Sequence, residues 1–179
     1  MTNILRCRGL WVWSGIAAII LGAGIVVAHR FYAHSTPERA LAAQQFPLPG
    51  IVRSILFAQG ELMIAKIGHD AGFNGWYLTH NLWGWHVGTP SMVYSHLAPS
   101  EFPISYAAIY ANGRTLLWGV TERPMKTVIL SWGHRSFSAA AGANGLWNMT
   151  VPGSVHVVYN RQWSMMLPNG KIAPMYPPV

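Results

Sequence analysis

Charge is scarce in this chain of 179 residues, at 9% of the sequence against about 25% in an average soluble domain. Five Asp and Glu stand against twelve Lys and Arg, which gives a net charge of +7. The acidic residues lie far apart in the sequence: Glu38, Glu61, Asp70, Glu101 and Glu122. A glycosidase needs two carboxylates close together, so such a pair would exist only if the fold assembled it. Low charge together with 51% hydrophobic residues indicates a β-rich, partly membrane-associated protein.

Cysteine is nearly absent: the one residue is Cys7, so no disulfide can form within the chain. Common enzyme signatures are missing too, including Gly-x-Ser-x-Gly, His-Glu-x-x-His, the Walker loop and Gly-x-Gly-x-x-Gly. The pair Ser91-Met92 occurs in the nucleophile motif of membrane signal peptidases, but the accompanying motifs are absent here. We therefore expect a protein that is not an enzyme, with no catalytic residue and no cofactor.

The basic residues are scattered rather than clustered, whereas a protein that reads nucleic acid concentrates them in one patch. We expect no nucleic-acid partner. Anionic surface polymers or lipid headgroups are the partners that this charge favours. Beyond the N-terminal region the basic residues are Arg53, Lys66, Arg114, Arg123, Lys126, Arg135, Arg161 and Lys171.

An uncharged apolar run, Leu10–Ala28, is the longest hydrophobic feature of the chain. As a helix it rises about 28 Å, which matches a hydrocarbon core of about 30 Å. We predict a transmembrane signal anchor over 10–29, a cytoplasmic N-terminus over 1–9 because of Arg6 and Arg8, and a C-terminal domain outside the cytoplasmic membrane. The alternative is cleavage after the small-residue pattern that ends at Ala28.

Small residues recur every fourth position within this run, at Ser14, Ala18 and Gly22. Such a face lets two membrane helices approach closely, so it predicts a homodimer or a partner membrane protein. The alternative is that these residues are simply common in membrane helices.

A short helix is predicted in the juxtamembrane linker, 30–49. Thr36 can cap the helix, Pro37 suits its first position, and Glu38 suits its first turn. Pro47 and Pro49 are expected to end it.

Strand patterns begin after Gly50, and the fold class is expected to be mainly β, or α+β overall. A β-hairpin subdomain is predicted over 50–103 and a β-sandwich domain over 104–179, with their independence left open. In the first, strands over Ile51–Ala58 and Leu62–Ile67 precede a loop over Asp70–Gly75. In the second, turn signals separate predicted strands at Ile104–Ala111, Thr115–Val120, Lys126–Trp132, Arg135–Ala141, Leu146–Val151, Val155–Tyr159 and Trp163–Leu167.

Two of these strands should supply the core of the sandwich. Alternate residues of a strand share one face. The predicted core residues are Val128, Leu130, Trp132, Trp147, Met149 and Val151.

The segment 75–90, GWYLTHNLWGWHVGTP, is the most aromatic part of the chain. A metal site at His80 and His86 is disfavoured, because six residues of strand separate the two by about 20 Å. A core hairpin is the preferred interpretation, because Trp and Tyr bury large areas. The alternative is a ligand-binding platform formed by Trp83, Trp85 and His86, since glycine beside aromatic rings can leave them open for stacking.

Three short pieces carry a resemblance to a known group of proteins: Thr36–Leu41, Leu82–Trp85 and Gly119–Pro124. Their order after an anchor resembles small membrane-anchored exported proteins of Gram-positive spore formers, in which the second half resembles an immunoglobulin-like β-sandwich. The resemblance implies a fold and a location, and it supplies no catalytic residue.

These observations predict a membrane-anchored extracytoplasmic binding or assembly module of the cell envelope, without catalytic activity. The alternative is an envelope hydrolase, acting on peptide or glycan, with an unrecognised active site. An exposed aromatic patch would favour the first, and a cleft that joins a nucleophile to a base would favour the second.

Overall fold

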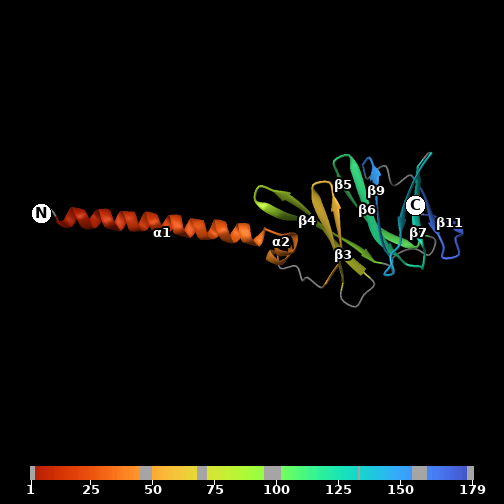
Figure 1. Cartoon of the computed structure of the whole chain (residues 1–179), viewed down its shortest axis with the longest axis horizontal. Coiled ribbons are helices and arrows are strands. Elements are labelled where there is room, and N and C mark those ends of the chain that lie inside the picture. The colour runs from red at the N-terminus through yellow and green to blue at the C-terminus, as the bar shows by residue number, and fades with distance from the viewer. Residues whose placement is uncertain are drawn as a thin grey trace. The chain divides into compact units, whose positions relative to one another are not determined.

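The computed structural model describes residues 3–44, 50–67, 72–94, 102–132, 134–154 and 161–176. It is mainly β, with antiparallel sheets that follow one long apolar helix and one short helix (Figure 1). The elements are α1 (Asn3–Ala33), α2 (Pro37–Ala43), β1 (Ile51–Phe57), β2 (Gly60–Lys66), β3 (Gly72–Asn81), β4 (Gly84–Tyr94), β5 (Ile104–Ala111), β6 (Arg114–Thr121), β7 (Thr127–Trp132), β8 (Arg135–Ala140), β9 (Leu146–Pro152), β10 (Gln162–Met166) and β11 (Ile172–Met175).

Contacts divide the chain into two units, each described separately. The anchor unit is Met1–Pro47 with His80–His86, the tip of the β3–β4 hairpin. The β unit is Leu48–Thr79 with Val87–Val179.

Helix α1 of the anchor unit contains one stretch, Ser14–Ala33, that is long and apolar enough to cross a membrane. Its large apolar side chains are exposed, including Ile19, Leu21 and Ile25, as expected of a helix whose surroundings are apolar. The helix continues past the predicted end at residue 29 as far as Ala33.

Helix α2 begins as its capping residues predict. The Thr36 hydroxyl accepts a hydrogen bond from the Arg39 N–H at 3.3 Å, and Pro37 occupies the first turn. Its buried side chains are Ala40 and Leu41. The helix ends at Ala43, ahead of the prolines expected to stop it, which lie outside the described residues.

The described strands form three sheets, with strand orders β1-β2-β3-β4, β5-β6-β9 and β11-β10-β7-β8. The β5-β6-β9 sheet contributes to both hydrophobic clusters of the unit. Leu116, Trp118 and Val120 of β6 join residues of the first sheet, including Leu62 and Ile64.

The other face of the same sheet packs against the last sheet. Leu117 of β6 and Trp147 of β9 join one cluster with Val128, Leu130 and Trp163. Strand β6 is therefore buried on both faces, which explains why its sequence between Thr115 and Val120 is continuously buried rather than alternating.

The strand predictions are largely confirmed over 104–152, and β10 matches the predicted strand at 163–167 within one residue. Five of the six predicted core residues are buried. The sixth, Trp132, is half-buried beneath the Arg161 guanidinium, 3.9 Å from its ring. The predicted strand Val155–Tyr159 lies outside the described residues.

One expectation about the strands was wrong. The predicted loop Asp70–Gly75 contains the start of β3, because Gly72 and Gly75 are buried strand positions. Pro90 lies inside β4, the end strand of its sheet, where a proline need not donate a hydrogen bond. A further strand near the C-terminus, β11, pairs with β10.

The division predicted between 50–103 and 104–179 concerns independent folding and stays a prediction. Apart from His80–His86, both stretches lie in the β unit, and one hydrophobic cluster contains residues from each of them, such as Phe73 and Trp118.

Candidate functional site

The anchor unit contains the candidate site, at the place where the hairpin tip meets the end of α1. Trp85 N–H donates to the backbone oxygen of His34 at 2.8 Å. His34 Nδ1 lies 2.7 Å from the backbone oxygen of Trp85, so Nδ1 carries the proton and donates. This reciprocal pair holds the tip against the helix end.

Glycine is required at position 84 for this contact. Gly84 has φ of +101°, a conformation that L side chains rarely adopt. A Cβ there would also lie 2.4 Å from the backbone oxygen of His34. The glycine in the Leu-Trp-Gly-Trp segment therefore permits close approach of two backbones.

Asn81 organises the turn itself. Its Oδ1 accepts a hydrogen bond from Trp83 N–H at 2.8 Å and lies 2.9 Å from His86 Nε2. Because this oxygen can only accept, His86 donates from Nε2. The Asn81 side chain therefore connects Trp83 in the turn with His86 at the end of the tip.

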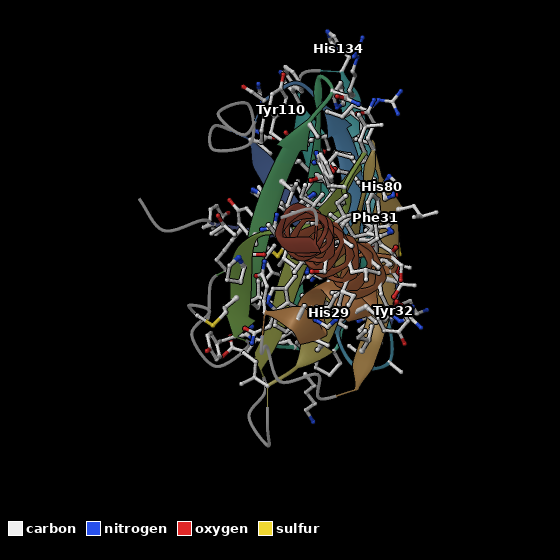
Figure 2. The ribbon with its side chains drawn as sticks, turned by 90° about the vertical axis from the view of Figure 1, so that its left-hand side faces the viewer. His29, Phe31, Tyr32, His80, Tyr110 and His134 are labelled. Atoms are coloured by element: carbon white, nitrogen blue, oxygen red, sulfur yellow. The ribbon has the colours of Figure 1, made fainter. Side chains whose placement is uncertain are left out.

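Aromatic contacts connect the tip with the helix. The rings of Phe31 and Trp83 lie 6.0 Å apart, and those of His34 and His86 stack at 5.6 Å. Within the tip, the His80 ring meets the edge of Trp85 at 5.2 Å. Figure 2 shows the side chains viewed along α1, with Phe31 on the helix and His80 on β3 labelled.

A groove of about 530 Å³ lies between these elements. Its lining residues carry one cation and no carboxylate: Val26, Val27, Arg30, Phe31, His34, Trp83 and His86. Most of its lining is apolar, and the nitrogen-bearing groups are those of Arg30, His34, Trp83 and His86. Such a groove suits an apolar or amphiphilic ligand with negative charge.

Two of the three predicted platform residues, Trp83 and His86, line this groove, whereas Trp85 does not. The preference for core is wrong for Trp83. Trp83 is 64% exposed and its neighbour Leu82 is 93% exposed. Trp85 and His86 are half-buried. The ring that does fill a core is Trp76, at the start of the same segment.

Sequence reasoning missed the helix side of the site, namely Arg30, Phe31 and His34. Their spacing carried a signal, because Val26, Arg30 and His34 recur every fourth residue and so share a helix face. That face was considered only as the end of a membrane anchor.

The remaining predicted residues lie elsewhere. Ser14, Ala18 and Gly22 are on the exposed surface of α1, and a Cβ on Gly22 would meet nothing within 4 Å. The Ser91 hydroxyl donates to the backbone oxygen of Gly75 at 3.3 Å. Within the described residues, no three His, Cys, Asp or Glu side chains are placed to hold a metal ion.

Among the described residues outside the site, Tyr77 has a shifted pKa. Burial raises the pKa of Tyr77 above 10.0, because removal from water disfavours the phenolate. The Tyr77 hydroxyl donates to the backbone oxygen of Phe57 at 2.9 Å, which connects β3 to the end of β1.

No protein-family model matches the chain, and comparison with curated proteins and with solved structures gives no match.

Proposed function

We propose that this chain is a membrane-anchored extracytoplasmic binding or assembly module of the cell envelope, without catalytic activity. The observation that carries the proposal is the exposed aromatic tip, Leu82-Trp83, held against the end of an apolar helix. A tryptophan at the end of a membrane span is typical of the membrane–water interface. The module would therefore present its binding site at the membrane surface.

The proposed topology has α1 crossing the cytoplasmic membrane with residues after 29 outside. Arg6 and Arg8 before the apolar stretch support this orientation. The single native cysteine makes the test clean. In intact cells, a membrane-impermeant maleimide should label a Cys7→Ser, Gln59→Cys variant at the exposed β1–β2 turn and should leave Cys7 of the parent unlabelled. Labelling only after lysis would contradict the topology.

The immunoglobulin-like assignment for 104–179 belongs to the same proposal, as does the resemblance to anchored proteins of Gram-positive spore formers. Numbering β5 to β11 as A, B, C, C′, E, F and G turns the strand orders into A-B-E and G-F-C-C′. These are the neighbour relations of immunoglobulin-like sandwiches. Such sandwiches serve many binding roles, so the fold supports a binding module without naming its ligand.

The hydrolase alternative has weaker support among the described residues. Ser91 hydrogen-bonds a backbone carbonyl, and Glu61 hydrogen-bonds Ser54 on an exposed part of the sheet. The groove at the tip is lined by histidines but by no serine, cysteine or carboxylate. Its composition favours binding over bond cleavage.

Two partner classes follow from surfaces of different kinds. A second copy or another membrane protein would meet the Ser14, Ala18 and Gly22 face of α1. An anionic surface polymer would meet the exposed basic side chains of the β unit, such as Arg53, Lys66 and Arg114, with affinity that falls as salt rises.

The binding role of the tip is tested by placing a photo-reactive phenylalanine derivative at position 83 of the full-length protein in native membranes. Tyr110, which is 53% exposed on β5, is the matched control position. We expect a defined adduct from position 83 and none from position 110. Equal adducts at both positions, or none at position 83, would contradict the proposed site.

A further inference from the structure

The groove beside the hairpin tip changes character along one face of α1. Val26 and Val27 come first, Arg30 and Phe31 follow one turn later, and His34 follows one turn after Arg30. Residues four apart lie one above the other on a helix. The lining therefore runs from aliphatic, through a cation and an aromatic ring, to imidazole.

The aliphatic end of this lining lies further inside the apolar stretch Ser14–Ala33 than Arg30 does. Val26 lies seven residues before its end, which is about 10 Å along the helix axis at 1.5 Å per residue. The interfacial layer of one leaflet is about 5–7 Å thick. If the stretch spans the membrane, Val26 and Val27 lie at the depth of the acyl chains, and Arg30 and His34 lie at or near the headgroups.

The hairpin tip supplies the other wall. Trp83 contributes an apolar ring next to Phe31, with ring centroids 6.0 Å apart, and His86 stacks on His34. In the neutral ring of His34, Nδ1 donates to the backbone and Nε2 is left as an acceptor. Arg30 is the one Arg or Lys side chain of the lining.

We propose that the groove binds a single phospholipid with an anionic headgroup. This inference rests on the proposed membrane location of the module. One acyl chain lies against Val26, Val27 and Trp83. The phosphate lies at Arg30, whose guanidinium can hold two phosphate oxygens at once. A headgroup hydroxyl can donate to Nε2 of His34 or to Nδ1 of His86, the ring nitrogens that do not donate to Trp85 or Asn81.

Charge and shape both favour a phospholipid as the occupant. A helical peptide would need a groove whose walls are apolar throughout. In this groove the cation, Arg30, lies within one helical turn of the aliphatic end. A small anion alone would leave the aliphatic end of the groove unfilled. An anionic phospholipid matches the apolar end and the cationic end together.

The test uses the full-length protein in detergent, incubated with phosphatidylglycerol or with phosphatidylcholine of the same acyl chains, and native mass spectrometry to count retained lipid. We expect one retained phosphatidylglycerol and much weaker retention of phosphatidylcholine. Arg30→Gln should reduce phosphatidylglycerol retention about tenfold, since it removes a charge-assisted hydrogen bond. Arg39→Gln, the same change at an exposed site on α2 in the same unit but outside the groove lining, should leave retention unchanged.

A second variant, Trp83→Ala, should weaken retention of both lipids, because it removes an apolar wall rather than the charge. Protection of the Trp85 amide against hydrogen exchange reports that the tip is still in place in each variant. Equal retention of the two lipids, equal retention by Arg30→Gln and its control, or release of phosphatidylglycerol by inorganic phosphate would each overturn the proposal. Because maleimide labelling decides the topology separately, loss of lipid selectivity in a correctly inserted protein contradicts the lipid site alone.

Discussion

At the scale of single residues, Gly75 shows what a missing side chain can provide. Gly75 faces Trp118, and a Cβ at Gly75 would lie 2.4 Å from Cζ2 of that buried ring. Gly75 was predicted to lie in a loop, and glycine is ordinarily unfavourable in strands. Glycine is favourable at this position of β3, because the space that it leaves is filled by the indole of Trp118 from β6.

Gly75→Ala is therefore expected to destabilise the protein by about 1–3 kcal/mol, the usual range for overpacking a core. For a chain of this size, each kcal/mol lowers Tm by about 2–4 °C. Thermal unfolding of the full-length protein in detergent micelles measures the shift. Gly50→Ala is the matched control, because a Cβ there meets nothing within 4 Å. Equal melting of the two variants would show that Trp118 is not packed on Gly75.

Tyr77 provides a prediction with a defined pH dependence. Its pKa is raised by burial, so the folded state retains the phenol proton at pH values where the unfolded state loses it. The contribution of Tyr77 to stability is fully present below pH 10.0 and is lost as pH rises through the folded pKa.

Comparison with Tyr77→Phe isolates this effect from other groups that titrate at high pH. The difference in unfolding free energy between the parent and Tyr77→Phe should be constant below pH 10.0 and should fall above it. Urea titrations at a series of pH values measure it. A difference that stays constant to high pH would mean that Tyr77 is solvated as fully in the folded state as in the unfolded state.

At the scale of elements, the β3–β4 hairpin was predictable, but the environment of its tip was not. Alternation and aromatic content identified a hairpin, and Trp76 and Leu78 are buried as that pattern requires. Trp83 is exposed because the tip contacts the end of α1 rather than a second sheet. That contact depends on His34 and Gly84, which are fifty residues apart in the chain, so local patterns could not reveal it.

Gly84→Ala should release the tip from the helix while the rest of the protein stays folded. The substitution combines a strained φ with a Cβ placed against the backbone oxygen of His34. Hydrogen exchange at the Trp85 amide, which donates to that oxygen, should become faster. Core amides of β6 serve as the internal reference. Unchanged exchange at Trp85 would contradict the contact between tip and helix.

At the scale of the whole molecule, composition and sequence pattern were sufficient to predict one long apolar helix followed by a mainly β region. The short helix, most strands of 104–179 and most of the core followed from capping residues, turn signals and alternation. The layering of the three sheets could not be predicted in this way. Strand β6 packs on both faces, and its continuous apolar sequence resembles that of any short buried segment. The helix half of the candidate site was also missed. In the sequence of an apolar helix, a residue that contacts another segment of the protein cannot be distinguished from one that contacts lipid.

The central claim is that the hairpin tip lies in the membrane interface. The most direct measurement places an environment-sensitive fluorophore at Leu82→Cys in a Cys7→Ser background, reconstituted in phospholipid vesicles. Gln44→Cys, at the exposed end of α2, is the matched position in the same unit. We expect blue-shifted emission at position 82 that is quenched by nitroxides attached near the lipid headgroup, and water-like emission at position 44. Water-like, unquenched emission at position 82 would contradict this claim.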